Sequence, residues 1–462
     1  MRTYRAAREM KHAVIITLLL ATACTARVGD GPSDVDGGVA TDGGSGPDAT
    51  VPVTGGPARY SAGELRSPIT ESVVNRMRAI YDRSGTANDV VFMKVGASGT
   101  VSSKFLDCFS GSSVDLDGRT HLQSTIDYYN MLMASGVSSW ERNTLAAVVG
   151  RSASWAISGD PSPIEEEISA INPRIALVNY GTNDMSLGIT HETALWPFVA
   201  NFNALLDELE GQGIIPVITG LNPRSDNATA ADWVPTYNSV VRAIAEKRQL
   251  PFINLYLASV DLPDMGLVGD GLHGNGFGGG SCVFTSEGLQ FNYNARNLLT
   301  LEALNDVKHV AIDDLDAPDG PTAGHTGTGA ADDAFVVDGL PFTHSANTAT
   351  SPHSSIDAYA SCDAGQDESG PELYYRLEIT EKTPVRIMVL DRGDVDVDIH
   401  LLSGGPGGDG CIDRDHRIIE RTLLPGTYYI SVDSFVNSDG VAQSGEFSLV
   451  VVKCADSDTR CE

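Results

Sequence analysis

The chain has 462 residues, of which 42% are hydrophobic and 20% charged, and its formal net charge is −30. This length exceeds what one hydrophobic core usually serves, so at least two folded domains are expected. So negative a surface repels phosphate backbones and anionic lipid headgroups, which argues against nucleic acid as a partner.

Residues 1–24 have the features of a targeting segment. Four basic residues (Arg2, Arg5, Arg8 and Lys11) precede the apolar run 13–20, which is too short to span a bilayer. The run 20–24 ends in Cys24 and resembles a bacterial lipobox, except that Ala21 stands where Leu is usual. We therefore predict an exported lipoprotein, in the periplasm or on the cell surface, attached to a membrane only by lipid on Cys24. Cleavage of an ordinary signal peptide near Ala23 is the alternative.

Residues 25–58 consist mainly of Gly, Asp, Pro, Ser and Thr, with scattered Val. Such a composition buries too little apolar surface to offset the entropy of ordering, so this segment is predicted to be a flexible linker.

Residues 59–310 alternate apolar strand-like runs with helical patterns. Runs at 89–95, 174–180, 214–219 and 251–256 are continuously apolar, as in parallel strands covered on both faces. Helical periodicity covers 192–210, 233–247 and 294–308. The alternation predicts a three-layer α/β domain around a parallel sheet.

After a Pro- and Gly-containing linker at 311–334, the pattern of residues 335–462 becomes all-β. Short strand-like runs at 373–379, 385–390, 395–402, 417–423, 427–434 and 446–452 predict a small β-sandwich. Asp394, Asp396 and Asp398 alternate and would share one strand face. We interpret that face as solvated; a calcium site is the alternative.

Ser98 is the candidate nucleophile, in Gly96-Ala97-Ser98-Gly99-Thr100 directly after the first strand-like run. A serine hydroxyl needs an adjacent base to attack a carbonyl carbon. The motif differs from the Gly-x-Ser-x-Gly elbow because Thr100 replaces its second glycine. Taken alone, this five-residue motif would be interpreted as an ordinary turn and not as a nucleophile site.

Asp270 and His273 are the candidate orienting acid and base, because a carboxylate three residues before an imidazole can fold back to it. Asp306 and His309 have the same spacing. That second pair closes a helical pattern, so it is interpreted as a helix-end pair.

Gly181-Thr182-Asn183-Asp184 follows a buried strand-like run and supplies an amide side chain; an Asx turn is the structural alternative. Taken in chain order, the Ser98 motif, Gly150, Asn183 and Asp270-Gly271-Leu272-His273 resemble the SGNH (GDSL) hydrolases over about residues 85–310. The resemblance implies a flavodoxin-like fold, with Ser98, Asp270 and His273 as catalytic triad. It also implies an oxyanion hole formed by Ser98, Gly150 and Asn183, with Gly159 as the rival of Gly150.

The sequence departs from that family at Ala97, where the family usually has Asp, which puts the loop geometry and the rate in doubt. In the C-terminal part, runs at 374–376, 395–399 and 424–430 resemble the pre-peptidase C-terminal domains of secreted bacterial enzymes.

These features predict a serine esterase that hydrolyses a short-chain ester, such as acetyl on a glycan, through an acyl-enzyme without metal or organic cofactor. An acyltransferase of the same fold and an inactive surface-binding module are the alternatives. The oligomeric state stays open. Because every motif precedes residue 275, the sandwich is predicted to be dispensable for chemistry.

Six cysteines remain when Cys24 is set aside, and six allow 15 pairings. Cys108 follows Ser98 by ten residues, and Cys282 follows His273 by nine. A bridge between them would join the two catalytic segments; pairing of either with the C-terminal cysteines is the alternative.

Overall fold

A computed structural model describes residues 56–362 and 365–462. The predicted targeting segment, Cys24 and nearly all of linker 25–58 lie outside the described residues. Within the described ranges, no helix is both long and apolar enough to cross a bilayer.

A four-stranded parallel sheet forms the centre of the N-terminal part, as predicted. Its order is β1 (Asn88–Gly96), β4 (Pro173–Asn179), β5 (Ile215–Thr219) and β6 (Phe252–Ile253). Strand β6 is shorter than its apolar run because Asn254 caps the next helix by accepting a hydrogen bond from the Leu257 backbone N–H at 3.2 Å. All four strands point the same way, so their carboxyl ends meet at one edge.

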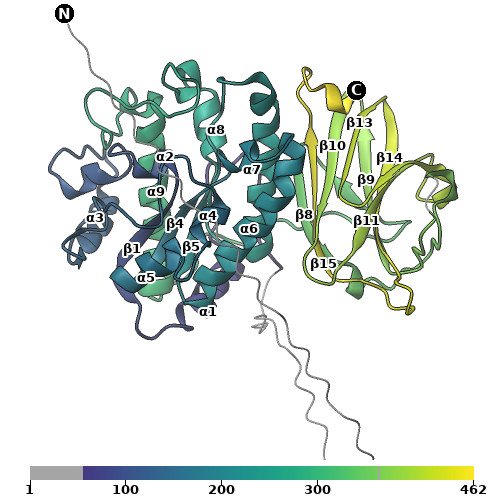
Figure 1. The fold of residues 1–462 in the computed structure, drawn as a ribbon, viewed down its shortest axis with the longest axis horizontal. Coiled ribbons are helices and arrows are strands. Elements are labelled where there is room, and N and C mark those ends of the chain that lie inside the picture. The colour runs from purple at the N-terminus through teal and green to yellow at the C-terminus, as the bar shows by residue number, and fades with distance from the viewer. Residues whose placement is uncertain (1–55, 363–364) are drawn as a thin grey trace, which may run out of the picture. The chain divides into compact units, whose positions relative to one another are not determined.

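Helices cover both faces of this sheet (Figure 1). They are α1 (Glu71–Tyr81), α2 (Ser98–Val101), α3 (Gln123–Tyr129), α4 (Ala153–Ala156), α5 (Pro163–Ile171), α6 (His191–Gly211), α7 (Ala228–Arg248), α8 (Leu255–Val260) and α9 (Asn292–Val307). Helices α6, α7 and α9 contain the three periodic segments. Helix α5 was not predicted, although Ser162 and Glu165 form a capping box at its start.

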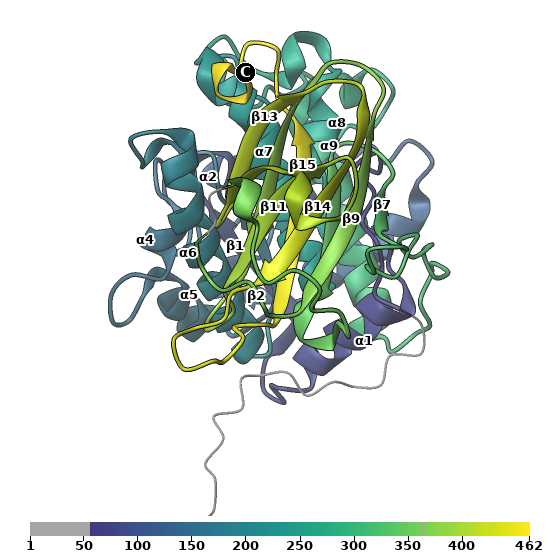
Figure 2. The ribbon, with the colours of Figure 1, turned by 90° about the vertical axis from the view of Figure 1, so that its right-hand side faces the viewer.

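The C-terminal part is a β-sandwich, which confirms the predicted fold class. One sheet has the order β13 (Ile418–Leu423), β10 (Thr383–Leu390), β15 (Glu446–Lys453) and β8 (Phe342–Asn347). The other has the order β12 (Cys411–Asp415), β11 (Val397–Ser403), β14 (Gly426–Ser434), β9 (Glu372–Ile379) and β7 (Phe335–Val337) (Figure 2). A short hairpin in the α/β part pairs β2 (Met133–Ala134) with β3 (Val137–Ser138).

Three buried carboxylates stand in one row across the second sandwich sheet. Asp398 on β11 lies opposite Asp433 on β14, which lies opposite Glu372 on β9. Asp398 is only 3% exposed, accepts a hydrogen bond from Gln366 at 2.9 Å and pairs with Arg414 at 3.2 Å. The predicted solvated face is therefore wrong for Asp398, since Gln366 and Arg414 supply polar partners that the strand pattern alone did not reveal.

The sandwich packs on helix α7, and apolar side chains of β10 and β15 enter the hydrophobic core of the α/β part: Met388, Leu390, Val450 and Val452. The fully buried Arg386 lies over the ring of Trp233 on α7, 3.6 Å from its centroid, and donates to Thr236 at 2.8 Å. Arg386 also pairs with Glu420 and Asp458, each at 2.6 Å.

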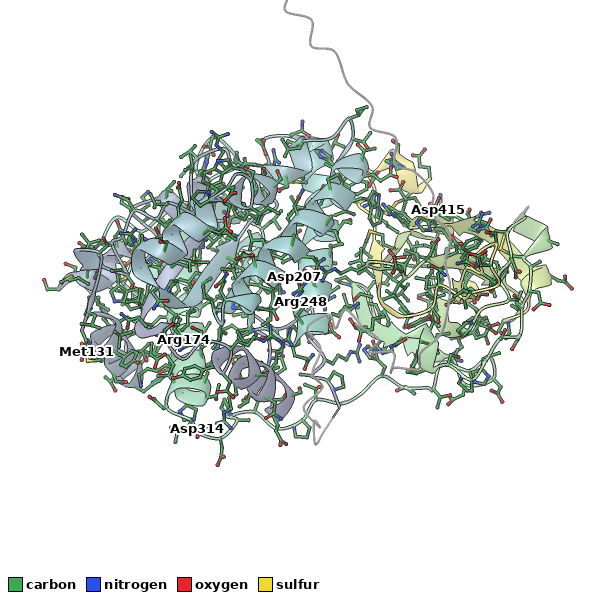
Figure 3. All side chains as sticks on the ribbon, turned by 60° about the horizontal axis from the view of Figure 1, so that its bottom comes forward. Met131, Arg174, Asp207, Arg248, Asp314 and Asp415 are labelled. Atoms are coloured by element: carbon green, nitrogen blue, oxygen red, sulfur yellow. A yellow bond between two sulfur atoms is a disulfide. The ribbon has the colours of Figure 1, made fainter. Side chains whose placement is uncertain are left out.

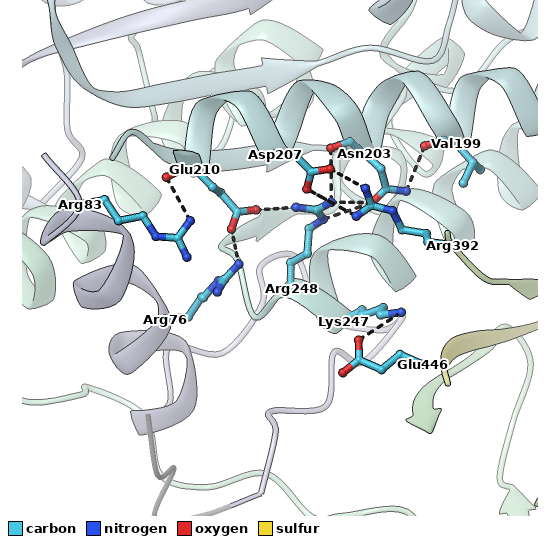
Figure 4. Close-up of polar contacts among 10 residues, drawn as sticks. All are labelled: Arg76, Arg83, Val199, Asn203, Asp207, Glu210, Lys247, Arg248, Arg392 and Glu446. Carbon is cyan, nitrogen blue, oxygen red and sulfur yellow. Dashed lines mark hydrogen bonds and ion pairs between the residues drawn. The ribbon is translucent and has the colours of Figure 1, made fainter. Parts of the chain in front are cut away.

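A polar network lies along the same contact (Figures 3 and 4). Arg248 on α7 pairs with Asp207 and Glu210 on α6, both at 2.7 Å. Arg392 of the sandwich also pairs with Asp207, while Lys247 pairs with Glu446 at 3.5 Å. These contacts make the two parts one packed body, which the composition of linker 311–334 did not suggest.

Candidate active site

Ser98 stands at the carboxyl end of β1, as the first residue of α2. The turn is tight: a Cβ on Gly96 would lie 2.3 Å from Thr100 Oγ1. Segment 146–148 continues the sheet beside this turn, because Gly96 donates to Ala146 O at 3.2 Å and accepts from Val148 N–H at 3.3 Å. The chain leading to Gly150 therefore runs along the same edge as Ser98.

Ser98, His273 and Asp270 form one continuous chain of hydrogen bonds. His273 Nε2 lies 2.9 Å from Ser98 Oγ, and His273 Nδ1 lies 2.7 Å from Asp270 Oδ2. Ser98 and His273 are 175 residues apart in sequence. With Nδ1 bonded to the carboxylate as a donor, Nε2 is the nitrogen free to accept the serine proton.

The Asp270–His273 loop holds its own carboxylate in place. Asp270 Oδ1 accepts hydrogen bonds from the backbone N–H groups of Leu272 at 2.9 Å and His273 at 3.0 Å. Gly271 has φ +69°, and a Cβ there would lie 2.6 Å from Ser225 Oγ. The glycine is therefore required both by its backbone conformation and by the close approach of the neighbouring loop.

Asp270 remains ionised although it belongs to the site. The backbone N–H and side chain of His273, together with the Leu272 N–H, lower the pKa of Asp270 to about 2. Its side chain is 49% exposed, so water also solvates the charge. The carboxylate can therefore accept the imidazole Nδ1–H at neutral pH.

Asn183 reaches the same pocket from the turn after β4. Its Nδ2 donates to Arg151 O at 2.8 Å, which leaves its second N–H available to the pocket. The adjacent Asp184 is 3% exposed and accepts from Ala153 N–H at 2.8 Å and Gly181 N–H at 3.0 Å. Burial raises the pKa of Asp184 to about 6. Asp184 thus fixes the turn 181–184 that presents Asn183. In the sequence, only its position at the end of the Gly181-Thr182-Asn183-Asp184 motif pointed to this role.

A shallow pocket with an accessible interior of about 30 Å³ opens beside Ser98. Its wall includes Ala97, Ser98, Gly99, Arg151, Asn179, Gly181, Thr182, Asn183, Leu272 and His273. Gly150 has φ +76° and is exposed; neither it nor Gly159 is among the wall residues, whereas Arg151 is. The structure thus gathers Ser98, Asn183, Asp270 and His273, and leaves Gly150 one residue outside the pocket wall.

The rival pair Asp306 and His309 does not form a dyad. Asp306 pairs with Arg66, while His309 lies in the π-helical turn Lys308–Ile312 that follows α9. This agrees with their interpretation as helix-end residues.

Cys108 and Cys282 are bonded, as predicted. Cys108 lies in the turn Asp107–Ser110 after the Ser98 segment, and Asp115 beyond it donates its N–H to Cys282 O at 2.9 Å. The other bridges, Cys362–Cys411 and Cys454–Cys461, lie within the sandwich.

The comparisons with known proteins agree with the motif pattern. Residues 127–278 match the model of the GDSL-like lipase/acylhydrolase family, a segment that includes Gly150, Asn183, Asp270 and His273 but begins after Ser98. No curated protein matches significantly.

Similar solved structures include a GDSL-like lipase from Bacteroides thetaiotaomicron (15% identity, 50% of this chain and 98% of that one, TM-score 0.31). A catalytic mutant of an acetylxylan esterase from Geobacillus stearothermophilus has 15% identity over 47% of this chain and 94% of that one, with TM-score 0.32. The pre-peptidase C-terminal domain of a Bacillus anthracis collagenase has 14% identity over 24% of this chain and 89% of that one, with TM-score 0.16. Within the α/β part of this chain, residues 127–278 are thus similar to the GDSL-like lipase/acylhydrolase family.

Proposed function

We propose that this chain is an exported serine esterase that removes a short acyl group, such as acetyl, through a covalent acyl-enzyme. The observation that carries the proposal is the Ser98–His273–Asp270 hydrogen-bond chain, at 2.9 and 2.7 Å. The family match of residues 127–278 supports acylhydrolase chemistry independently of Ser98, which lies outside it.

In the proposed reaction, Ser98 Oγ attacks the ester carbonyl carbon while its proton passes to His273 Nε2. The carbonyl oxygen becomes an oxyanion, for which Ser98 N–H and the free N–H of Asn183 are the proposed donors. Ser98 N–H is available because the first residue of a helix has no intrahelical acceptor. Gly150 N–H is the third proposed donor; Gly150 itself lies one residue outside the pocket wall.

Collapse of this intermediate breaks the ester C–O bond, and the alcohol leaves with the proton from His273. Water then attacks the acyl-enzyme carbonyl while giving a proton to His273 Nε2. The second collapse releases the carboxylic acid and returns the proton to Ser98 Oγ. Throughout, ionised Asp270 stabilises the imidazolium form of His273.

The pocket supports a short acyl group and a large alcohol. A single water needs about 10–15 Å³ of accessible volume, so about 30 Å³ suits an acetyl group and not a long chain. The His273 and Asp270 side chains are 39% and 49% exposed, so the alcohol side is open to a bulky group such as a sugar. Three disulfides fit the proposed export, since such bonds persist in oxidising compartments.

Hydrolysis of p-nitrophenyl acetate, butyrate and octanoate, together with acetate release from acetylated oligosaccharides, tests the proposal. We expect kcat/KM to fall steeply from acetate to octanoate. A fluorophosphonate probe should label the peptide that contains Ser98. Absence of both hydrolysis and labelling in folded protein would contradict the proposed activity.

A further inference from the structure

Arg296 on α9 lies beneath the turn that carries Ser98. The side chain is nearly fully buried and stands over the ring of Phe105, 3.9 Å from its centroid. A guanidinium group is costly to bury, because it loses the water that solvates its charge. The burial of this charged side chain therefore needs a compensating interaction or a functional role.

The hydrogen bonds of Arg296 join two motif segments. Nη1 donates to Gly99 O at 2.9 Å, and Nη2 donates to Asn179 Oδ1 at 3.2 Å. A longer contact of 3.5 Å reaches Thr100 Oγ1. Gly99 follows Ser98, whereas Asn179 ends β4 just before the turn that presents Asn183. A Cβ on Gly99 would lie 3.1 Å from Nη1, so the second glycine of the motif makes room for the guanidinium.

Every hydrogen-bond acceptor of Arg296 is neutral. Among the described residues no carboxylate forms an ion pair with it, whereas the equally buried Arg174 pairs with Asp89 at 2.8 Å and Arg386 pairs with two carboxylates. Burial lowers the pKa of Arg296 to about 10, so the group still carries its charge at neutral pH. An uncompensated positive charge therefore lies behind the nucleophile.

We infer that Arg296 is a positioning residue of the acyl-transfer site, one that fixes the Ser98 turn and places a positive field behind the oxyanion that forms there. This inference rests on the proposed function. Charges act strongly over several ångströms when water is excluded, and a fixed charge needs no reorganisation as the oxyanion develops. In the resting protein no carboxylate balances the positive charge of Arg296. The oxyanion of the tetrahedral intermediate supplies this balancing negative charge.

Arg296→Met keeps the shape of the side chain and removes its charge, while Arg296→Lys keeps a charge without the planar donors. Arg174→Met is the matched control, because Arg174 is equally buried but lies at the amino end of β4, away from the carboxyl ends of the strands where Ser98 stands. Each variant is measured for Tm, kcat and KM on p-nitrophenyl acetate, and rate of inactivation by a fluorophosphonate.

We expect Arg296→Met to lower kcat and the inactivation rate by about 10- to 100-fold with KM within about threefold, somewhat less than loss of a direct oxyanion donor. Arg296→Lys should recover a large part of kcat. Arg174→Met should lower Tm comparably and keep kcat near the wild-type value.

Equal kcat in folded Arg296→Met and wild type would overturn the inference, as would an equal loss of kcat in Arg174→Met. If Arg296→Met does not fold, Arg296→Gln, which removes the charge but keeps an amide donor, takes its place: unchanged kcat and inactivation rate would overturn the inference, whereas a lowered kcat at unchanged KM would support it. Failure of the proposed function is a separate result, since it appears as wild-type activity that survives Ser98→Ala.

Discussion

Asp270 combines three roles in one short loop: it accepts the N–H of Leu272, the N–H of His273 and the Nδ1–H of the same histidine. The first two bonds fix the carboxylate relative to the backbone, and the third fixes the imidazole relative to the carboxylate. Within these four residues the loop fixes one side of the ring, while Nε2 on the other side contacts Ser98. The three-residue spacing works in this loop after the last parallel strand, whereas the same spacing in Asp306 and His309, at a helix end, forms no dyad.

The proposed triad predicts a graded loss of activity. Ser98→Ala and His273→Ala should lower kcat by at least about 10⁴-fold, while Asp270→Asn should leave a small residual rate. His309→Ala is the control and should change little, because His309 lies outside the site. Full activity in folded Ser98→Ala, measured with p-nitrophenyl acetate, would show that the nucleophile is another residue.

Asn183 offers a second test at the residue scale. If its free N–H serves the oxyanion, Asn183→Ala should lower kcat about 100-fold with a small change in KM. A change confined to KM would instead assign Asn183 to substrate binding. Steady-state kinetics on the acetate ester distinguish the two outcomes.

The low pKa of Asp270, about 2, predicts the shape of the pH–rate profile. Because this pKa is lowered, the carboxylate is already ionised at pH 4 and does not titrate as pH rises to 8. Between pH 4 and 8 the profile should therefore carry no contribution from Asp270, in contrast to buried Asp184, whose pKa is raised to about 6. NMR titration of the Asp270 carboxylate measures this directly: we expect a midpoint near pH 2, and a midpoint above pH 4 would contradict the prediction.

The parallel strands could be predicted because each is a continuous apolar run, and α6, α7 and α9 because their periodicity is long. Strands β7, β8 and β12 were missed, since none of them carries a long apolar run and each depends on cross-strand neighbours. The Ser98, Asn183 and Asp270–His273 segments could be found as motifs. Arg296 could not, because one arginine in a helix gives no sign that it will lie under a turn nearly 200 residues away.

The Cys108–Cys282 bridge links the elements that present Ser98 and His273. The bond closes a separation of 174 residues, whereas Cys454–Cys461 closes only 7. Loop-closure entropy predicts that Cys108→Ala/Cys282→Ala lowers the free energy of unfolding by about 5 kcal/mol, against about 2 to 3 kcal/mol for Cys454→Ala/Cys461→Ala. Urea denaturation of both double variants measures the difference; equal losses would contradict the loop-length argument.

At the scale of the whole molecule, the contact with the sandwich revises the idea that the C-terminal part can simply be removed. The domain boundaries at 59–310 and 335–462 stay predictions, but truncation after Val310 would uncover Trp233 and neighbouring apolar groups of α7. We expect this truncated chain to have a lower Tm and to bind a hydrophobic dye, while any folded fraction keeps its kcat on a small ester. A truncated chain with wild-type Tm would mean that the interface contributes little.

Folding of the sandwich is coupled to proton binding, because buried carboxylates in and beside the row keep their protons in the folded chain. Burial raises the pKa of Asp433 to about 9. Glu368 lies beside the row, 3.6 Å from His400 on β11, and burial together with nearby Asp398 raises its pKa. An unfolded Asp titrates near 3.9, so between that pH and about 9 the folded chain holds protons that the unfolded chain releases.

Between about pH 7 and 9 stability should therefore fall as pH rises. Below about pH 6.5 the contribution is opposed by His325, His344 and His400, since burial lowers their pKa values to about 4, 3 and 3. Calorimetry at pH 8 should give an unfolding enthalpy that varies with the ionisation heat of the buffer, and Asp433→Asn should reduce that variation. In alkaline surroundings the sandwich itself would then unfold more easily than at neutral pH, although none of these carboxylates lies on the sheet that packs against α7.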